Sequence, residues 1–148
     1  MTDTIIVGGG AAGCVAAIYA ARWGKSVMLF EKNERVGRKL RITGKGRCNV
    51  TNDCDKNEFL SNVASNSKFL FAAISRFSTA DTKEFFEYLG VPLKTERGKR
   101  VFPVSDKAQD VVSAMQSACV DSGVRIINKK IDSLVIEDGK VVGVVANG

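Results

Sequence analysis

The sequence predicts an α/β fold that opens with a βαβ unit over residues 4–31. Residues 4–7 and 26–30 are short apolar runs of the kind that form buried parallel strands. Between them, the alanine-rich run 11–23 predicts a helix, and Gly24 stands where a helix C-terminal glycine belongs. With 148 residues, 45% hydrophobic and 26% charged, the chain has the size and composition of one globular domain with a core.

A glycine-rich turn joins the first predicted strand to the first predicted helix. Residues 8–13 read Gly-Gly-Gly-Ala-Ala-Gly and satisfy the G-x-G-x-x-G pattern. Gly8 permits the tight turn, Gly10 lets a diphosphate approach the backbone, and Gly13 lets the helix pack closely on the strand. The free N–H groups and the positive end of the helix then attract the diphosphate. The turn therefore predicts a dinucleotide site.

Glu31 stands at the end of the second strand, 18 residues after Gly13. A carboxylate in this position accepts hydrogen bonds from an adenosine ribose diol and repels a 2′-phosphate. NADP is therefore a poor ligand for this site. NAD and FAD both carry the free ribose, and the glycine turn and Glu31 do not distinguish them.

Residues 32–52 have no clean period and are predicted to form a long loop with one helical turn. Long ordered loops in compact domains are usually functional. Most of the net charge of +6 lies here, because seven basic residues and two acidic ones fall between positions 31 and 47. The basic residues are Lys32, Arg35, Arg38, Lys39, Arg41, Lys45 and Arg47. Such a cluster suits a polyanion, either a diphosphate or a nucleic acid.

Residues 56–90 are predicted to be helical in three pieces that pack an apolar, phenylalanine-rich face into the core. The third piece begins near Ser78 and Thr79 and stops at Gly90 before Pro92. The apolar positions are Phe59, Leu60, Val63, Phe69, Leu70, Ala73, Ile74, Phe77, Phe85, Phe86 and Leu89.

The last segment, residues 105–146, is predicted to contain a helix, a strand and a hairpin. A short extended piece at 100–104 precedes it, Ser105 caps the helix, and Gly123 ends it. Residues 124–127 form the strand, and residues 130–137 and 140–146 form a hairpin around Asp138-Gly139. A two-stranded hairpin rarely ends a domain, so we expect a further strand returning to the parallel sheet.

The cysteines and the absence of histidine exclude several chemistries. Cys14, Cys48, Cys54 and Cys119 form no CxxC pair, and the sequence contains no histidine. Structural zinc and a histidine-based triad are therefore not expected within this chain. Scattered cysteines fit a reducing cytoplasm. No apolar stretch is long enough for a membrane span, because glycines interrupt the run 5–21.

Residues 37–52 carry a specific resemblance to a known family. They read Gly-Arg-Lys-Leu-Arg-Ile-Thr-Gly-Lys-Gly-Arg-Cys-Asn-Val-Thr-Asn, and residues 100–108 read Arg-Val-Phe-Pro-Val-Ser-Asp-Lys-Ala. Both segments resemble the bacterial aminoacetone-oxidase-like and bile-acid-dehydro-reductase-like FAD-binding flavoproteins. The resemblance implies a Rossmann-like FAD-binding domain of the two-dinucleotide-binding-domain type, with an inserted helical segment and a β-hairpin.

The resemblance also implies where FAD would lie. Adenosine would lie near Glu31, with the diphosphate over residues 10–12 and the flavin beside the loop 38–49. The backbone of the strand near Ile131 would meet the adenine. The expected cofactor-binding residues are Gly8, Gly10, Ala11, Ala12, Gly13, Glu31, Lys32, Arg38, Lys39, Thr43, Gly44, Gly46, Arg47, Cys48, Asn49 and Ile131.

The expected function is that of an FAD-dependent oxidoreductase, with NAD(P)H as the reductant of an unsaturated substrate. Backbone N–H groups of residues 44–49 are expected to stabilise negative charge on the reduced flavin, and Arg47 to do the same or to hold phosphate. Cys48 is expected to be a small hydrophobe rather than a redox thiol. No residue is assigned as catalytic.

Family members continue well beyond 148 residues, so this chain is expected to be the N-terminal portion of a longer protein. By itself the chain is expected to be inactive. Two alternatives remain open. One is a nucleic-acid-binding module, although the basic loop 32–47 has no aromatic residue to stack on bases. The other is a non-catalytic nucleotide sensor.

Overall fold

The computed structural model describes residues 2–146, which divide into two compact units. The terminal unit comprises the residues up to Leu40 and those from Met115 onward, and the middle unit is Arg41–Ala114. The boundary falls inside the predicted loop 32–52. The first part of that loop therefore belongs to the terminal unit and the second part to the middle unit.

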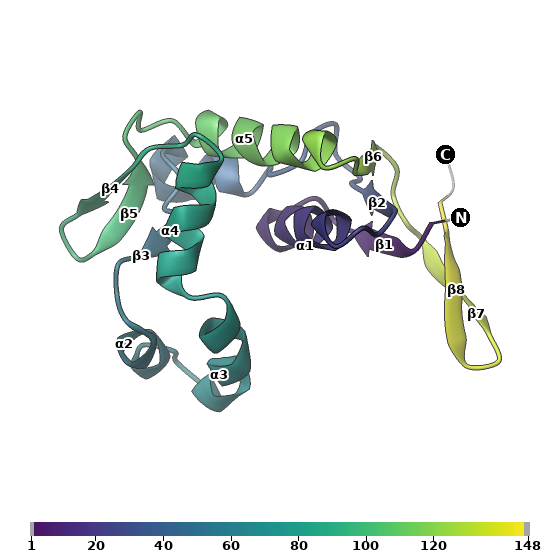
Figure 1. The fold of residues 1–148 in the computed structure, drawn as a ribbon, viewed down its shortest axis with the longest axis horizontal. Coiled ribbons are helices and arrows are strands. Elements are labelled where there is room, and N and C mark those ends of the chain that lie inside the picture. The colour runs from purple at the N-terminus through teal and green to yellow at the C-terminus, as the bar shows by residue number, and fades with distance from the viewer. Residues whose placement is uncertain (1, 147–148) are drawn as a thin grey trace. The chain divides into compact units, whose positions relative to one another are not determined.

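The terminal unit is built on a three-stranded parallel sheet in the order β1-β2-β6 (Figure 1). Its strands are β1 (Thr4–Val7), β2 (Val27–Phe30) and β6 (Arg125–Ile127), with Thr4 opposite Val27 and Phe30 opposite Ile127. Helix α1 (Ala11–Arg22) connects β1 to β2 and packs against both. The predicted βαβ unit is confirmed, with boundaries that differ by at most one residue.

The core of the terminal unit lies between this sheet and two helices. Helix α5 (Ala108–Asp121) crosses the unit boundary, and its second half contributes Met115 and Cys119, both fully buried. Helix α1 contributes small side chains, which allow close approach to the strands. The other fully buried residues of this core are Cys14, Ala17, Ile18 and Leu29.

The predicted hairpin is present as β7 (Ser133–Glu137) and β8 (Lys140–Val145). Asp138 and Gly139 both have positive φ, +49° and +74°, as a two-residue type I′ turn requires. The first strand begins at Ser133 and not at Lys130. Just after β6, the backbone N–H of Lys129 bonds the carbonyl of Ile127 and turns the chain. Ile131 therefore lies in the connection between β6 and β7, and its predicted place on a strand was wrong.

The middle unit contains a second sheet that the sequence did not predict as a whole. It is antiparallel, in the order β3-β5-β4, with β3 (Thr51–Asn52), β5 (Arg100–Pro103) and β4 (Leu93–Glu96). An extended piece at 100–104 was predicted, and β5 ends one residue earlier, at Pro103. Strand β4 was not predicted, and Thr51–Asn52 was assigned to a loop. Both are short, and their pairing depends on β5, which is distant from β3 in the chain.

Three helices complete the middle unit, at the three predicted places. They are α2 (Lys56–Ser61), α3 (Ser67–Arg76) and α4 (Thr79–Tyr88). Ser78 caps α4 in a reciprocal capping box with Asp81. Val63, assigned to the first helical piece, lies just after the end of α2.

The expectation that the phenylalanine-rich face packs in the core was wrong for Phe69 of α3. Phe85 and Phe86 of α4 are buried, whereas Phe69 is 79% exposed. Leu70 and Ile74, four residues apart, are half-buried and define the inner face of α3. Phe69 precedes Leu70 by one residue and therefore points about 100° away from that face.

Two further local predictions need correction. Helix α5 begins at Ala108, and the Ser105 hydroxyl accepts a hydrogen bond from the backbone N–H of Lys107, ahead of the helix. Ser105 therefore shapes the preceding turn and does not cap the helix directly. The helical turn predicted in the loop is a 3₁₀ segment, η1 (Leu40–Gly46), which kinks at residues 43–45.

Candidate cofactor-binding site

The glycine turn between β1 and α1 leaves open space where a ligand would approach. Gly8 has a φ of +103° and bonds back to the carbonyl of Phe30. A Cβ atom on Gly10 would meet no atom within 4 Å, whereas one on Gly13 would lie 1.9 Å from the carbonyl oxygen of Gly8. Gly13 is therefore required by packing inside the protein, and Gly10 faces unfilled space.

The start of α1 matches the needs of a bound diphosphate. Gly10 is the N-cap residue, no side chain caps the helix, and its first turn contains no acidic residue. Ala11 and Ala12 are exposed at this end. The first N–H groups of a helix have no partner within the helix, and the helix dipole favours an anion there. The residues present thus fit the diphosphate of a dinucleotide.

Glu31 is buried, and backbone N–H groups hold both of its carboxylate oxygens. The Gly9 N–H donates to Oε2 at 2.8 Å and the Asn33 N–H donates to Oε1 at 2.8 Å. Burial pushes the pKa of Glu31 upward, but the bonds from Asn33 and Gly9 outweigh burial and leave the pKa below its ordinary value. Glu31 is therefore an ionised acceptor in a defined position, with lone pairs still available to a ribose diol.

A cavity of about 480 Å³ joins the turn to Glu31, entirely within the terminal unit. Its volume is in the range of small-ligand sites. Several predicted residues line it: Gly8, Gly10, Glu31, Lys32, Arg38, Lys39 and Ile131. The structure thus brings together turn, acid and basic residues that are separated in sequence, and Ile131 reaches the cavity from the β6–β7 connection.

The sequence predictions missed four polar or charged residues of this region. Asn33 bonds Glu31, Asn128 donates to the carbonyl of Asn33 at 2.7 Å, and Lys129 and Lys130 line the cavity. An asparagine two residues after a strand-end acid is a typical turn former, so Asn33 had a local signal. The others approach only through the pairing of β6 with β2.

The remaining predicted residues, Thr43, Gly44, Gly46, Arg47, Cys48 and Asn49, lie in the middle unit. Gly44 has a positive φ, and a Cβ there would lie 2.9 Å from the ring of Phe102. Gly46 also has a positive φ. The backbone N–H of Cys48 donates to the carbonyl of Thr43, and the side-chain amide of Asn49 lies beside the carbonyls of Thr51 and Val101. These contacts define a tightly folded loop packed on β5.

Arg47 is engaged by groups of its own unit. Its guanidinium bonds Glu96 at 2.9 Å and Asp106 at 3.0 Å and lies 4.0 Å from the ring centre of Phe102. Arg47 lowers the pKa of Glu96, and Lys94 and then Arg47 lower the pKa of Asp106. The charge of Arg47 is thus largely matched by two carboxylates. These ion pairs give Arg47 a structural role that competes with its expected role as a phosphate or flavin ligand.

The four cysteines are free thiols in the structure. Cys48 is buried, and burial raises its pKa. Contact with Cys119, and then burial, raise the pKa of Cys14. A reactive thiol needs an accessible, acidified environment. Cys48 therefore has the surroundings of a packed apolar residue, as the sequence predicted.

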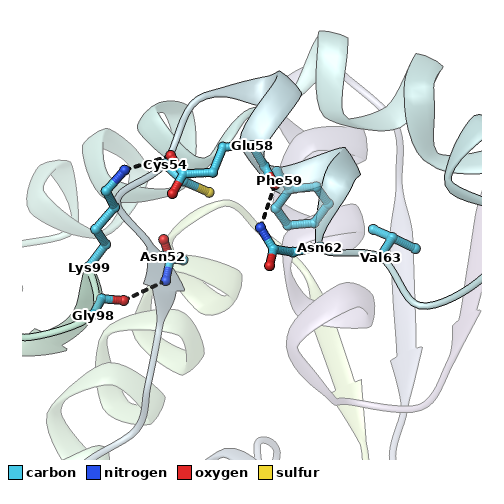
Figure 2. Close-up of a pocket in the computed structure, with 8 residues that line it drawn as sticks. All are labelled: Asn52, Cys54, Glu58, Phe59, Asn62, Val63, Gly98 and Lys99. Carbon is cyan, nitrogen blue, oxygen red and sulfur yellow. Dashed lines mark hydrogen bonds and ion pairs between the residues drawn. The ribbon is translucent and has the colours of Figure 1, made fainter.

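A second cavity, of about 520 Å³, lies in the middle unit beside α2 and the β4–β5 turn (Figure 2). Lys99 pairs with Glu58 at 2.6 Å, Asn52 donates to the carbonyl of Gly98, and Asn62 donates to the carbonyl of Glu58. These interactions tie the turn to α2. No predicted site residue lines this cavity.

Neither a membrane span nor a metal cluster is found among residues 2–146. No helix in this range is long and apolar enough to cross a membrane. The same residues contain no group of three or more Cys, Asp or Glu side chains placed to hold a metal ion.

A parallel βαβ unit, an uncapped glycine turn and an anchored acid at the end of β2 define a Rossmann-type dinucleotide-binding domain. The family model described as HI0933-like protein Rossmann domain matches residues 2–148. The chain belongs to this family. Family and fold together make it the FAD-binding Rossmann portion of a flavoprotein, and they favour this assignment over a nucleic-acid-binding module or a nucleotide sensor.

Named relatives support the assignment. The chain is 35% identical over 144 residues to the 3-dehydro-bile acid delta(4,6)-reductase of Clostridium scindens, covering 86% of this chain and 32% of that protein. It is 30% identical over 127 residues to the ribosomal RNA dihydrouridine synthase of Haemophilus influenzae, covering 85% of this chain and 31% of that protein. The chain thus spans about a third of the length of these relatives.

The fold is also found in solved structures. The 3-ketosteroid-delta4-(5alpha)-dehydrogenase from Rhodococcus jostii matches with a TM-score of 0.76 at 18% identity, covering 99% of this chain and 42% of that one. At this identity the match shows a shared fold.

Proposed function

We propose that the terminal unit binds the ADP half of FAD and that the whole protein is an FAD-dependent oxidoreductase. The supporting observation is the cavity that joins the open face of Gly10 to the anchored carboxylate of Glu31. In this proposal the backbone of residues 10–12 holds the diphosphate and Glu31 accepts the ribose hydroxyls. FAD supplies the hydride chemistry, while the protein positions it.

The proposed residue roles in the middle unit rest on the sequence motif. The loop 43–49 serves the flavin side of the cofactor, with backbone N–H groups as donors. Arg47 holds that loop in shape through Glu96 and Asp106, which is the role its contacts support. NAD(P)H is the proposed reductant of an unsaturated substrate, in line with a relative that is named a reductase. The free cysteines fit the cytoplasm as the proposed compartment.

Titration calorimetry with FAD and ADP-ribose tests the proposal. The Gly10→Val variant should lose binding of both ligands while retaining the wild-type melting temperature, because its side chain enters space that no protein atom occupies. Ala16→Val, at an exposed position of α1 outside the turn, is the matched control and should bind both ligands normally. Wild-type affinity in Gly10→Val would place the diphosphate elsewhere.

A further inference from the structure

Asn33 forms the centre of a small hydrogen-bonded cluster beside Glu31. Both its backbone N–H and its side-chain Nδ2 donate to Glu31 Oε1. Its side-chain Oδ1 accepts from Arg38 Nη1 at 2.8 Å, and its carbonyl accepts from Asn128 Nδ2 at 2.7 Å. One side chain thus joins the carboxylate after β2 to the basic loop, and Asn128 ties it to the end of β6.

The charges around the same cavity oppose the selectivity expected of Glu31. The lining residues include five cations and one carboxylate, Glu31. The cations are Lys32, Arg38, Lys39, Lys129 and Lys130. Such a rim attracts phosphate groups in general, including a ribose 2′-phosphate. Rejection of a 2′-phosphate therefore depends on where the single carboxylate is held and on where the nearby arginine points.

Asn33 controls both of these positions. Without its amide, Glu31 Oε1 keeps one backbone donor and its side chain gains freedom to turn. Arg38 loses its acceptor at the same time and becomes available to a phosphate, for which a guanidinium is a strong partner. A single substitution would thus weaken the repulsive group and release an attractive one.

We propose that Asn33 is a positioning residue that makes the site select an unphosphorylated adenosine ribose over a 2′-phosphorylated one. The proposal rests on the proposed function, because it takes Glu31 as the ribose acceptor. Asn33 itself acts through Glu31 and Arg38 and need not touch the ligand.

The test compares the dissociation constants of ADP-ribose and 2′-phospho-ADP-ribose on the 148-residue chain. Wild type should prefer ADP-ribose. Asn33→Ala should reduce the ratio of the two constants by roughly tenfold, the effect of one charge-assisted hydrogen bond. Asn33→Ala/Arg38→Ala should recover part of the preference, because the released arginine is gone. Asn62→Ala is the matched control, since its amide donates to a backbone carbonyl in α2, and it should keep the wild-type ratio.

The outcomes separate this proposal from the function on which it rests. If Glu31→Gln lowers the ratio but folded Asn33→Ala keeps it, the positioning role is wrong and the ribose assignment stands. If Glu31→Gln also keeps the ratio, or if wild type binds neither ligand, the proposed site itself fails. Asn33→Ser, which keeps a small turn-forming side chain, replaces the alanine variant if circular dichroism shows that the latter is unfolded. An unchanged ratio in this variant overturns the proposal equally.

Discussion

Gly10 and Gly13 lie three residues apart in one turn, yet a side chain would meet different surroundings at each. At Gly13 the nearest atom is the carbonyl oxygen of Gly8, which belongs to the backbone and has little room to move. At Gly10 no atom lies within 4 Å and φ is −81°, a conformation open to any residue. The pattern G-x-G-x-x-G therefore combines a folding requirement with a proposed binding requirement.

We expect Gly13→Ala to lower the free energy of unfolding by at least about 2 kcal/mol, as overpacking against backbone does. Gly10→Ala should lower it by less than about 1 kcal/mol, because no atom crowds the new methyl group and only the N-cap preference for glycine over alanine is lost. Urea denaturation of both variants measures the difference. Equal stability of the two would mean that the α1–β1 packing relaxes to accept a methyl group at position 13.

Glu31 should also contribute to stability in a pH-dependent way. Its pKa in the folded chain lies below its ordinary value of 4.5, so the folded state favours the charged form. This contribution is present above pH 4.5 and is lost as the pH falls through the lower folded pKa. The stability gap between wild type and Glu31→Gln, measured by urea denaturation, should therefore shrink on acidification. A gap independent of pH would show that the ionised form is not what the turn stabilises.

At the scale of elements, the 43–49 loop acquires its shape from the small sheet beneath it. Val50 donates its N–H to Val101 on β5, and Arg47 reaches Glu96 on β4 and Asp106 before α5. The loop is thus anchored from three positions that are distant in sequence. Its order is a property of the middle unit and not of the loop sequence alone.

Arg47→Met should lower the urea midpoint and speed hydrogen exchange at the Val50 amide. The substitution keeps a flexible apolar side chain over Phe102 but leaves Glu96 and Asp106 with Lys94 as their remaining cation. Arg41→Met, at an exposed arginine two residues before this loop, is the control and should change neither measurement. Identical behaviour of the two variants would contradict the role of Arg47 in anchoring the 43–49 loop.

At the scale of the whole molecule, the residues proposed to bind adenosine and diphosphate all belong to one unit. The cavity lined by the turn, Glu31 and the basic residues is formed by the terminal unit alone. The chain, meanwhile, spans about a third of the relatives' length. The ADP half of FAD therefore has its proposed partners within these 148 residues.

We expect FAD and ADP-ribose to bind the 148-residue chain with dissociation constants within about fivefold of each other, because the flavin half adds little without an enclosing pocket. Calorimetric titration of both ligands under identical conditions measures the ratio. FAD binding more than about a hundredfold tighter, or nearly 3 kcal/mol, would show that this chain also encloses the flavin.

The sequence by itself determined the βαβ unit, the three helices of the middle segment and the hairpin turn. Each depends on local chemistry: glycines where φ is positive, a capping box at Ser78, and apolar runs of strand length. The same local signals located the glycine turn and Glu31. They also led to the family, through the motif at residues 37–52, whose last two residues form β3.

Only the tertiary structure decided which segments meet. The pairing of β3 and β4 with β5, the exposure of Phe69, the approach of Ile131 to the cavity and the engagement of Arg47 by Glu96 and Asp106 were not predictable. The reason is physical. Short strands have weak propensities of their own and form when a partner strand supplies their hydrogen bonds. Likewise, a charged side chain takes its role from whichever opposite charges the fold brings within reach, and no spacing along the chain encodes that distance.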